Sequence, residues 1–186
     1  MFKSVFTLFQ YYLLQVPEIK YVGFYANQFN NLEGEREIPF PAALIEILPI
    51  TNINNLGDRV QNTIVSVNIH VGTEIYKGLE DGDNQQNDGL DQLGLLDDVF
   101  AKLDNISTKS TGYPASGTTL SGITYDYTNF ATGFVRRTNV IPTVPNSALR
   151  VSTIGFEMTL TDITAQPTWV YTEESGVTYE LSGLTY

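Results

Sequence analysis

Polar and apolar residues alternate one by one along residues 60–72, the most regular pattern in the chain. Strict period-two alternation is typical of a β-strand that turns one face to the core and the other to solvent. The turn-forming residues 54–58 come just before it, so we expect an antiparallel hairpin with the apolar segment 42–48. The face turned to the core is expected to carry Thr63, Val65, Val67, Ile69 and Val71, and the opposite face Asn62, Ile64, Ser66, Asn68 and His70.

Further strands are predicted from β-forming residues and turn signals. Residues 19–25 form a short β-rich segment, and residues 123–140 are expected to be extended. Residues 151–162 alternate again, and the side chains expected to point inward are Ile154, Phe156, Met158 and Leu160. Residues 169–172 and 177–181 flank a polar turn and predict a closing hairpin, or an arm that is ordered only by a neighbouring chain.

Two segments carry apolar residues three and four positions apart, the spacing of one face of an α-helix. The first ends at Pro17, which cannot continue a helix, and its apolar residues are Phe2, Val5, Phe6, Phe9, Tyr12, Leu13 and Val16. The second covers residues 90–106, and its apolar stripe is Leu93, Leu96, Val99, Phe100 and Leu103. Because Gln10 and Gln15 interrupt the first segment, we expect a helix there and neither an export signal nor a membrane span.

These elements predict a single α+β domain over residues 1–186. We expect a mixed or antiparallel β-sheet packed by two α-helices, in the order α-β-β-β-α-β-β, with a β-rich C-terminal extension. Residues 74–91 are expected to be an acidic loop and residues 107–122 a low-complexity loop, both as insertions. Residues 162–186 are the candidate C-terminal arm.

The composition favours a subunit of a protein assembly. Charged residues make up 17% of the chain against the usual figure of about 25%, while 11 Tyr and 10 Phe make it rich in aromatic side chains. Interface cores show the same bias, because they lose Lys and Glu and gain aromatic residues. A net charge of −11 argues against a protein that grips nucleic acid, since that affinity comes from basic residues.

Few residues are suited to catalysis. The chain has no cysteine, which excludes disulfides, thiol catalysis and cysteine-ligated metals, and it has one histidine, His70. A hydrolytic triad would therefore depend on His70, and no Gly-x-Ser-x-Gly elbow supplies its partner. Phosphate-binding glycine motifs are absent as well. We therefore expect His70 to be an ordinary surface or interface residue, and the pair Arg136–Arg137 to be a salt-bridging or interface feature.

Acidic residues are concentrated between positions 74 and 98, a segment that contains eight carboxylates and one lysine, Lys77. Residues 81–85 suggest a calcium loop, but Gln86 and Gln92 stand where an EF-hand needs Gly and Glu. The other interpretations are a solvated loop and a surface that repels a polyanion. We expect no cofactor, no metal and no catalytic residue, and the candidate lumen or interface residues are Glu80, Asp81, Asp83, Asp88 and Asp91.

The order of elements resembles that of the tail terminator and tail completion proteins of long-tailed bacteriophages. The resemblance depends on the amphipathic helix 2–16, the strand after Pro17, the proline-led strand that begins Pro39-Phe40-Pro41, the alternating strand 60–71 and the helix 90–106. It covers most of the chain as topology. The long loop 107–122, the acidic segment and the C-terminal extension depart from it.

The resemblance implies a structural virion protein without enzymatic activity. Its copies would form a homo-oligomeric ring, a hexamer in that family, in the phage neck, where it terminates the tail tube. Its partners would be the tail tube protein and the head-completion or connector protein, and DNA would pass through without specific binding. The chain would be made in the host cytoplasm and would not associate with membrane.

Two alternatives from other classes stay open at this point. One is a calcium- or carbohydrate-binding, adhesin-like β domain, which would suit exposed tyrosines and an acidic loop. The other is a small hydrolase, in which His70 and a nearby carboxylate would lie in a cleft.

Overall fold

The structure is a computed structural model of the chain. It describes residues 2–30, 38–50, 53–55, 61–74, 82–104, 106, 117–120, 122–125, 130–146, 149–162, 169–172 and 178–181.

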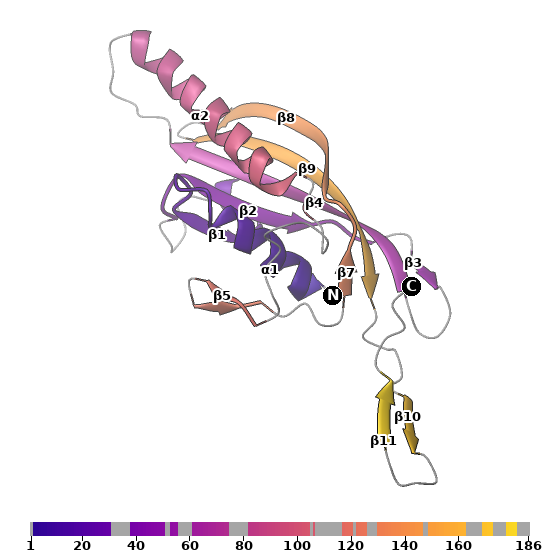
Figure 1. The fold of residues 1–186 in the computed structure, drawn as a ribbon. Helices are drawn as coiled ribbons and strands as arrows, with labels where there is room; N and C mark the ends of the chain where they lie inside the picture. Colours follow the sequence, from indigo (N-terminus) through magenta and orange to yellow (C-terminus); the bar gives the residue numbers. More distant parts are fainter. Residues whose placement is uncertain are drawn as a thin grey trace.

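A mixed seven-stranded sheet is the centre of the fold (Figure 1). Its strands are β1 (Tyr21–Phe24), β2 (Ala42–Ile47), β3 (Ile53–Asn55), β4 (Gln61–Glu74), β7 (Phe130–Thr132), β8 (Arg136–Asn146) and β9 (Leu149–Asp162). The order across the sheet is β1-β2-β4-β9-β7, with β3 beside β4 and β8 beside β9. Only the β1–β2 pair is parallel, and the other pairs in this sheet are antiparallel. The predicted α+β fold class is confirmed.

Strands β4 and β9 form the longest pair, which joins Gln61 with Asp162 at one end and Glu74 with Leu149 at the other. All 14 residues of β4 take part. Both strands alternate as predicted, and the residues expected to face the core are buried in each of them. The predicted antiparallel pairing of β2 with β4 is also present.

Helices α1 (Phe2–Leu13) and α2 (Gly82–Leu103) lie on the same face of this sheet (Figure 1). Their buried side chains form one core with that face, and those that the helices contribute are Val5, Leu8, Phe9, Tyr12, Leu13, Leu95, Leu96, Val99 and Leu103. The predicted helical stripes are wrong at Phe2 and Leu93, which are more than half exposed. Gln92 is buried in place of Leu93, and its amide nitrogen lies 3.3 Å from the Ser152 hydroxyl, so a polar residue satisfied by a hydrogen bond occupies the core.

The opposite face of the sheet is only partly covered. A small apolar cluster of Phe29, Ala42, Leu44 and Leu149 lies at one end. Gly72 permits this packing, because a Cβ at that position would lie 2.7 Å from the Phe29 ring. The rest of this face, which we call the open face, carries Ile64, Ser66, Asn68 and His70 from β4.

The predicted acidic loop 74–91 is wrong over residues 82–91, because α2 begins at Gly82. Residues 82–89 contain no apolar side chain, so no helical period could be recognised there. The predicted loop 107–122 contains strand β5 (Thr119–Leu120), which pairs with β6 (Ile123–Thr124), and residues 107–116 lie outside the described part. The closing hairpin is confirmed as β10 (Trp169–Thr172) and β11 (Thr178–Leu181), which stand away from the main sheet (Figure 1).

The two faces of β4 predict opposite responses to the same substitution. Ile69 is fully buried, so we expect Ile69→Ala to lower the free energy of unfolding by about 2–5 kcal/mol through lost burial and the cavity left behind. Ile64 is 56% exposed on the same strand, so Ile64→Ala should change the free energy of unfolding by about 0.5 kcal/mol or less. Urea unfolding of both variants measures the difference, and equal effects would contradict the assignment of the two faces.

Candidate functional site

The open face of the sheet carries a hydrogen-bonded cluster around His70. The register places His70 between Leu44 of β2 and Thr153 of β9. Its Nε2 lies 3.0 Å from Glu46 Oε2, and its Nδ1 lies 2.9 Å from Thr153 Oγ1. Asn68 donates from Nδ2 to the same Glu46 oxygen at 2.9 Å. The cluster therefore joins three adjacent strands through side chains.

An aromatic ring covers this cluster. Tyr25, the residue after β1, stacks on the His70 imidazole with a centroid distance of 3.9 Å and an interplanar angle of 15°. Its hydroxyl donates to Asn27 Oδ1 at 3.0 Å, which holds the ring from its far end. As a result, only 12% of the His70 side chain is exposed.

The carboxylate of Glu46 determines how the protons are arranged. It can only accept, so His70 Nε2–H donates to it, and in the neutral ring Nδ1 accepts from the Thr153 hydroxyl. Burial alone would raise the pKa of Glu46, but the hydrogen bonds from Asn68 and His70 and the charge of His70 lower it below its usual value of 4.5. The ionised form of Glu46 is therefore the one that the cluster stabilises.

Thr153, His70 and Glu46 include the residue types of a hydrolytic triad, but their arrangement favours a structural role. Both ring nitrogens of His70 are engaged within the sheet, and the Tyr25 ring covers the imidazole. Thr153 lies inside the paired length of β9, opposite His70 on one side and Ile141 of β8 on the other. A nucleophilic hydroxyl needs a base that is free to take its proton, access for the substrate and donors for an oxyanion nearby. This geometry supports a structural role of His70 more than the hydrolase alternative, but the predicted surface position is wrong, because only 12% of the side chain is exposed.

The predicted acidic residues are not gathered into one loop. Asp83 and Asp88 lie in the first half of α2, Asp91 is exposed on the same helix, and Glu80 and Asp81 lie outside the described residues. The first turns of α2 extend past the end of the sheet (Figure 1). Because residues 82–85 are helical, they do not form the contiguous loop that the calcium interpretation requires. Within the described residues, no group of three or more His, Asp or Glu side chains is placed to hold a metal ion.

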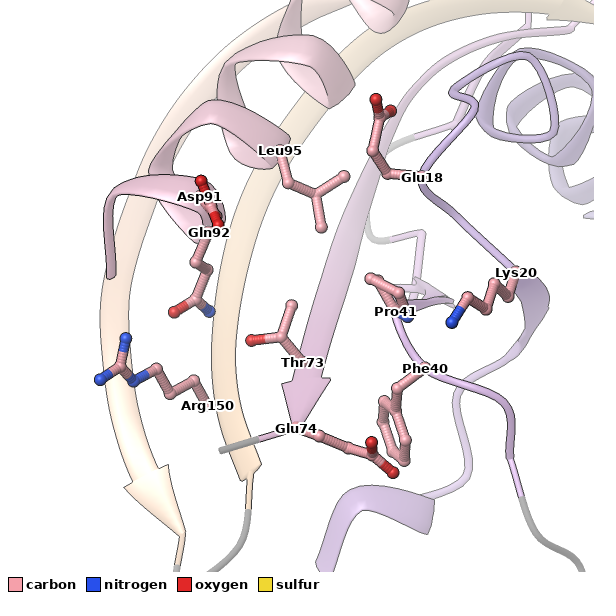
Figure 2. A pocket seen from close by; sticks show the side chains of 10 residues that line it. All are labelled: Glu18, Lys20, Phe40, Pro41, Thr73, Glu74, Asp91, Gln92, Leu95 and Arg150. Carbon is pink, nitrogen blue, oxygen red and sulfur yellow. The ribbon is translucent and has the colours of Figure 1, made fainter. Parts of the chain in front are cut away.

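One pocket, with a volume of about 240 Å³, opens where α2 meets the end of β4 and the start of β9 (Figure 2). Its lining residues are Glu18, Lys20, Phe40, Pro41, Thr73, Glu74, Asp91, Gln92, Leu95 and Arg150. Of the predicted site residues, Asp91 is among those that line this pocket. Lys20 and Arg150 come from opposite walls of the pocket, between carboxylates (Figure 2). Positive and negative side chains are therefore mixed in the lining, and the pocket does not select a small ligand of one charge.

The two neighbouring arginines separate onto opposite faces of β8. Arg137 pairs with Phe156 on the helix-covered face, and its guanidinium carbon lies 3.9 Å from the centre of the Phe100 ring. Arg136 pairs with Glu157 on the open face. The pair therefore does not form one basic patch. Arg137 makes a cation–π contact, and the expected salt-bridging or interface role of the pair stays a prediction.

The lowered pKa of Glu46 predicts how a neutral substitute depends on pH. We expect Glu46→Gln to lower the free energy of unfolding at pH 7 by about 1 kcal/mol or less, because partly exposed ion pairs are screened by solvent. The ionised Glu46 carboxylate adds to the free energy of unfolding. This stabilisation is present above pH 4.5 and is lost as the pH falls through the lowered folded-state pKa. Urea unfolding between pH 7 and pH 3 measures this difference.

The matched control is Glu157→Gln on the same face, where the carboxylate lies opposite Arg136 and accepts from the Ser66 hydroxyl at the long distance of 3.5 Å. The free energy of unfolding of Glu157→Gln should differ from that of the unchanged protein by about 0.5 kcal/mol or less at pH 7. If Glu46→Gln lowered the free energy of unfolding by the same amount at every pH, this would contradict the conclusion that the cluster stabilises the ionised form of Glu46.

No protein-family model matches the chain, and a search of curated proteins finds no match. Among the described residues, no helix has both the length and the apolar character needed to cross a membrane.

Proposed function

We propose that the chain is a structural protein of a tailed bacteriophage virion, located in the neck. Its copies form a ring, a hexamer by the resemblance described above, that terminates the tail tube and joins it to the head connector while DNA passes through. The protein makes or breaks no covalent bond in this role. The partners are further copies of the chain, the tail tube protein and a head-completion or connector protein.

The observation that carries this proposal is the set of large apolar side chains left at the surface. Among the described residues they are Phe2, Tyr21, Phe24, Ile53, Ile64, Leu93, Phe134, Val140 and Ile141. Single exposed apolar residues are normal, but here several lie in strands at the two ends of one sheet. Together with the low charged fraction of 17%, these exposed side chains support the proposal that the chain buries part of its surface against neighbours.

The element order gives the second support. Helix α1, the β1–β2–β4 strands, helix α2 and the late strand β9 follow the order on which the resemblance to tail terminator and tail completion proteins depends. The β10–β11 hairpin, which stands away from the sheet (Figure 1), is suited to reach an adjoining subunit. The cluster around His70, whose ring nitrogens are both engaged, gives no comparable support to an enzyme.

The acidic helix supports a passage that DNA does not bind. The segment 74–98 carries eight carboxylates and one lysine, and part of it extends past the sheet as the start of α2 (Figure 1). Repulsion between these carboxylates and phosphates acts over about 8 Å at physiological salt. In a ring with α2 toward its opening, the helices would keep the DNA from adhering to the wall.

Deleting the gene tests the neck assignment. We expect filled heads and separate tails that do not join, because the surface between them is missing, and joining should return when the protein is supplied in trans. Electron microscopy counts joined and unjoined particles. Immunogold labelling of complete virions should place the protein at the junction of head and tail, and normal particles from the deletion strain would overturn the proposal.

Neutralising α2 tests the acidic passage separately. We expect Asp83→Asn, Asp88→Asn and Asp91→Asn together to slow DNA ejection, most clearly at low ionic strength, because screening weakens the repulsion as salt rises. Ejection is followed by the fluorescence of a DNA-binding dye after a receptor trigger. The control is Asp97→Asn with Asp98→Asn, which removes exposed charge from the second half of the same helix. Unchanged ejection at all salt concentrations would contradict the acidic passage but would not contradict the location in the neck.

A further inference from the structure

One face of the β10–β11 hairpin is aromatic and uncharged. The register places Trp169 opposite Leu181 and Tyr171 opposite Tyr179. Because successive residues of a strand belong to opposite faces, these four residues share one face of the hairpin. Glu180 is the only charged residue of the two strands, and it belongs to the other face. We call the hairpin the arm and these four residues its aromatic face.

The aromatic face needs a cover. A two-stranded hairpin is at best marginally stable in water unless a hydrophobic face packs against something. The arm forms a sheet of its own and stands away from the main sheet (Figure 1). Three aromatic side chains that bury about 150–250 Å² each approach the ~800 Å² that each partner buries in a standard interface. The arm is therefore large enough to anchor a contact between two chains.

A matching surface lies on the open face of the main sheet, around Ile64. This side chain is 56% exposed, although its strand runs through the centre of the sheet. The paired residues around it on the same face are polar and uncharged, and they are Asn54, Asn62, Ser66, Thr159 and Thr161. We call Ile64 and these five residues the uncharged patch. The next residue along β9 on this face is charged, and it is Glu157.

The arm leaves the sheet beside this patch. β9 ends at Asp162, which pairs with Gln61 at the start of β4, three residues before Ile64. Six residues, 163–168, separate β9 from β10, and six extended residues span at most about 20 Å. In copies that stand side by side, the arm of one copy therefore begins close to the patch of the next. Neither surface carries a charge, so their burial does not require the costly desolvation of an ion.

We propose that the arm of one copy docks, by its aromatic face, on the uncharged patch of the next copy. This inference rests on the proposed assembly of the chain with itself and names the contact that joins successive copies. Amide and hydroxyl oxygens of the patch can accept hydrogen bonds from the indole and phenol groups of the arm. Arm and patch are different surfaces, so the contact is heterologous, and it closes into a ring when the rotation between copies is a whole fraction of a turn.

A charge in the centre of the patch tests the contact. We expect Ile64→Glu to abolish the multimers seen by native mass spectrometry at high protein concentration, because docking would bury the new carboxylate against aromatic rings. The matched control is Leu93→Glu, since Leu93 is 57% exposed on α2, on the other side of the sheet. The control should assemble like the unchanged protein, and circular dichroism establishes that both variants are folded.

Trp169 reports directly on the arm, because it is the only tryptophan in the chain. Its emission should shift to shorter wavelengths, and its quenching by acrylamide should weaken, as the protein concentration rises and copies assemble. In Ile64→Glu both signals should stay at their low-concentration values. Multimers that form without a change in Trp169 emission would overturn the arm contact and leave the proposed assembly unchallenged.

The absence of cysteine allows the two sides of the contact to be linked. A mixture of the single variants Ile64→Cys and Tyr171→Cys should give a covalent dimer with a short thiol cross-linker, while each variant alone should stay unlinked. The control mixture is Leu93→Cys with Tyr171→Cys, and it should give no dimer. Purified protein at high concentration and particles that carry the variants are both examined.

Three further results would overturn the proposal. In the double variant Ile64→Cys with Tyr171→Cys, a link within one chain and none between chains would show that the arm folds back on its own sheet. A photoreactive label on Tyr171→Cys that joins a different virion protein would show that another partner covers the arm. A chain that is monomeric in solution and unlinked in particles would overturn the proposed assembly as well.

Discussion

The pairing of β4 with β9 is the constraint on which the rest of this structure depends. Fourteen residues of each strand are in register, and in β4 apolar side chains alternate with mostly polar ones. Because the side-chain period of a strand is two, a slip of one residue would turn the buried set, including Val65 and Ile69, out to the open face. The large loss of apolar burial in such a slip excludes it. One face is thereby assigned to the two helices, and the other is left for the His70 cluster.

The same constraint leads to the exposed ends of the sheet. With β4 and β9 in the centre, β2 and β1 can extend the sheet only on one side and β8 and β7 only on the other. The helices cover the middle of one face, and so Phe24 and Val140 at the margins stay exposed. The described chain has no element beyond β1 or β8. In the proposed assembly, neighbouring copies would cover these margins, and the low charged content fits that proposal, because covered margins do not need the charged side chains that keep a free edge soluble.

Much of the fold could be predicted because its main signals are local. The alternation in residues 60–72 and 151–162 predicted both central strands and their buried faces, and the spacing of apolar residues three and four apart predicted helix α1. The start of α2 could not be predicted, because residues 82–89 have no apolar side chain and a helix there lies largely beyond the sheet. The burial of Gln92 in place of Leu93 was also hidden, since it depends on a hydroxyl 60 residues away in β9.

The candidate sites were harder to predict because they depend on pairing across the sheet. Glu46 belongs to an apolar strand and gave no signal of its own; its position beside His70 follows only from the register of β2 with β4. Thr153 reaches the same imidazole from 83 residues along the chain. Edges are likewise a property of topology: nothing in the sequence of residues 136–141 distinguishes a central strand from an outer one. Pro142 and Pro145 are the exception, because a central strand does not tolerate prolines, so their presence places β8 at an edge and limits any added strand to the residues before them.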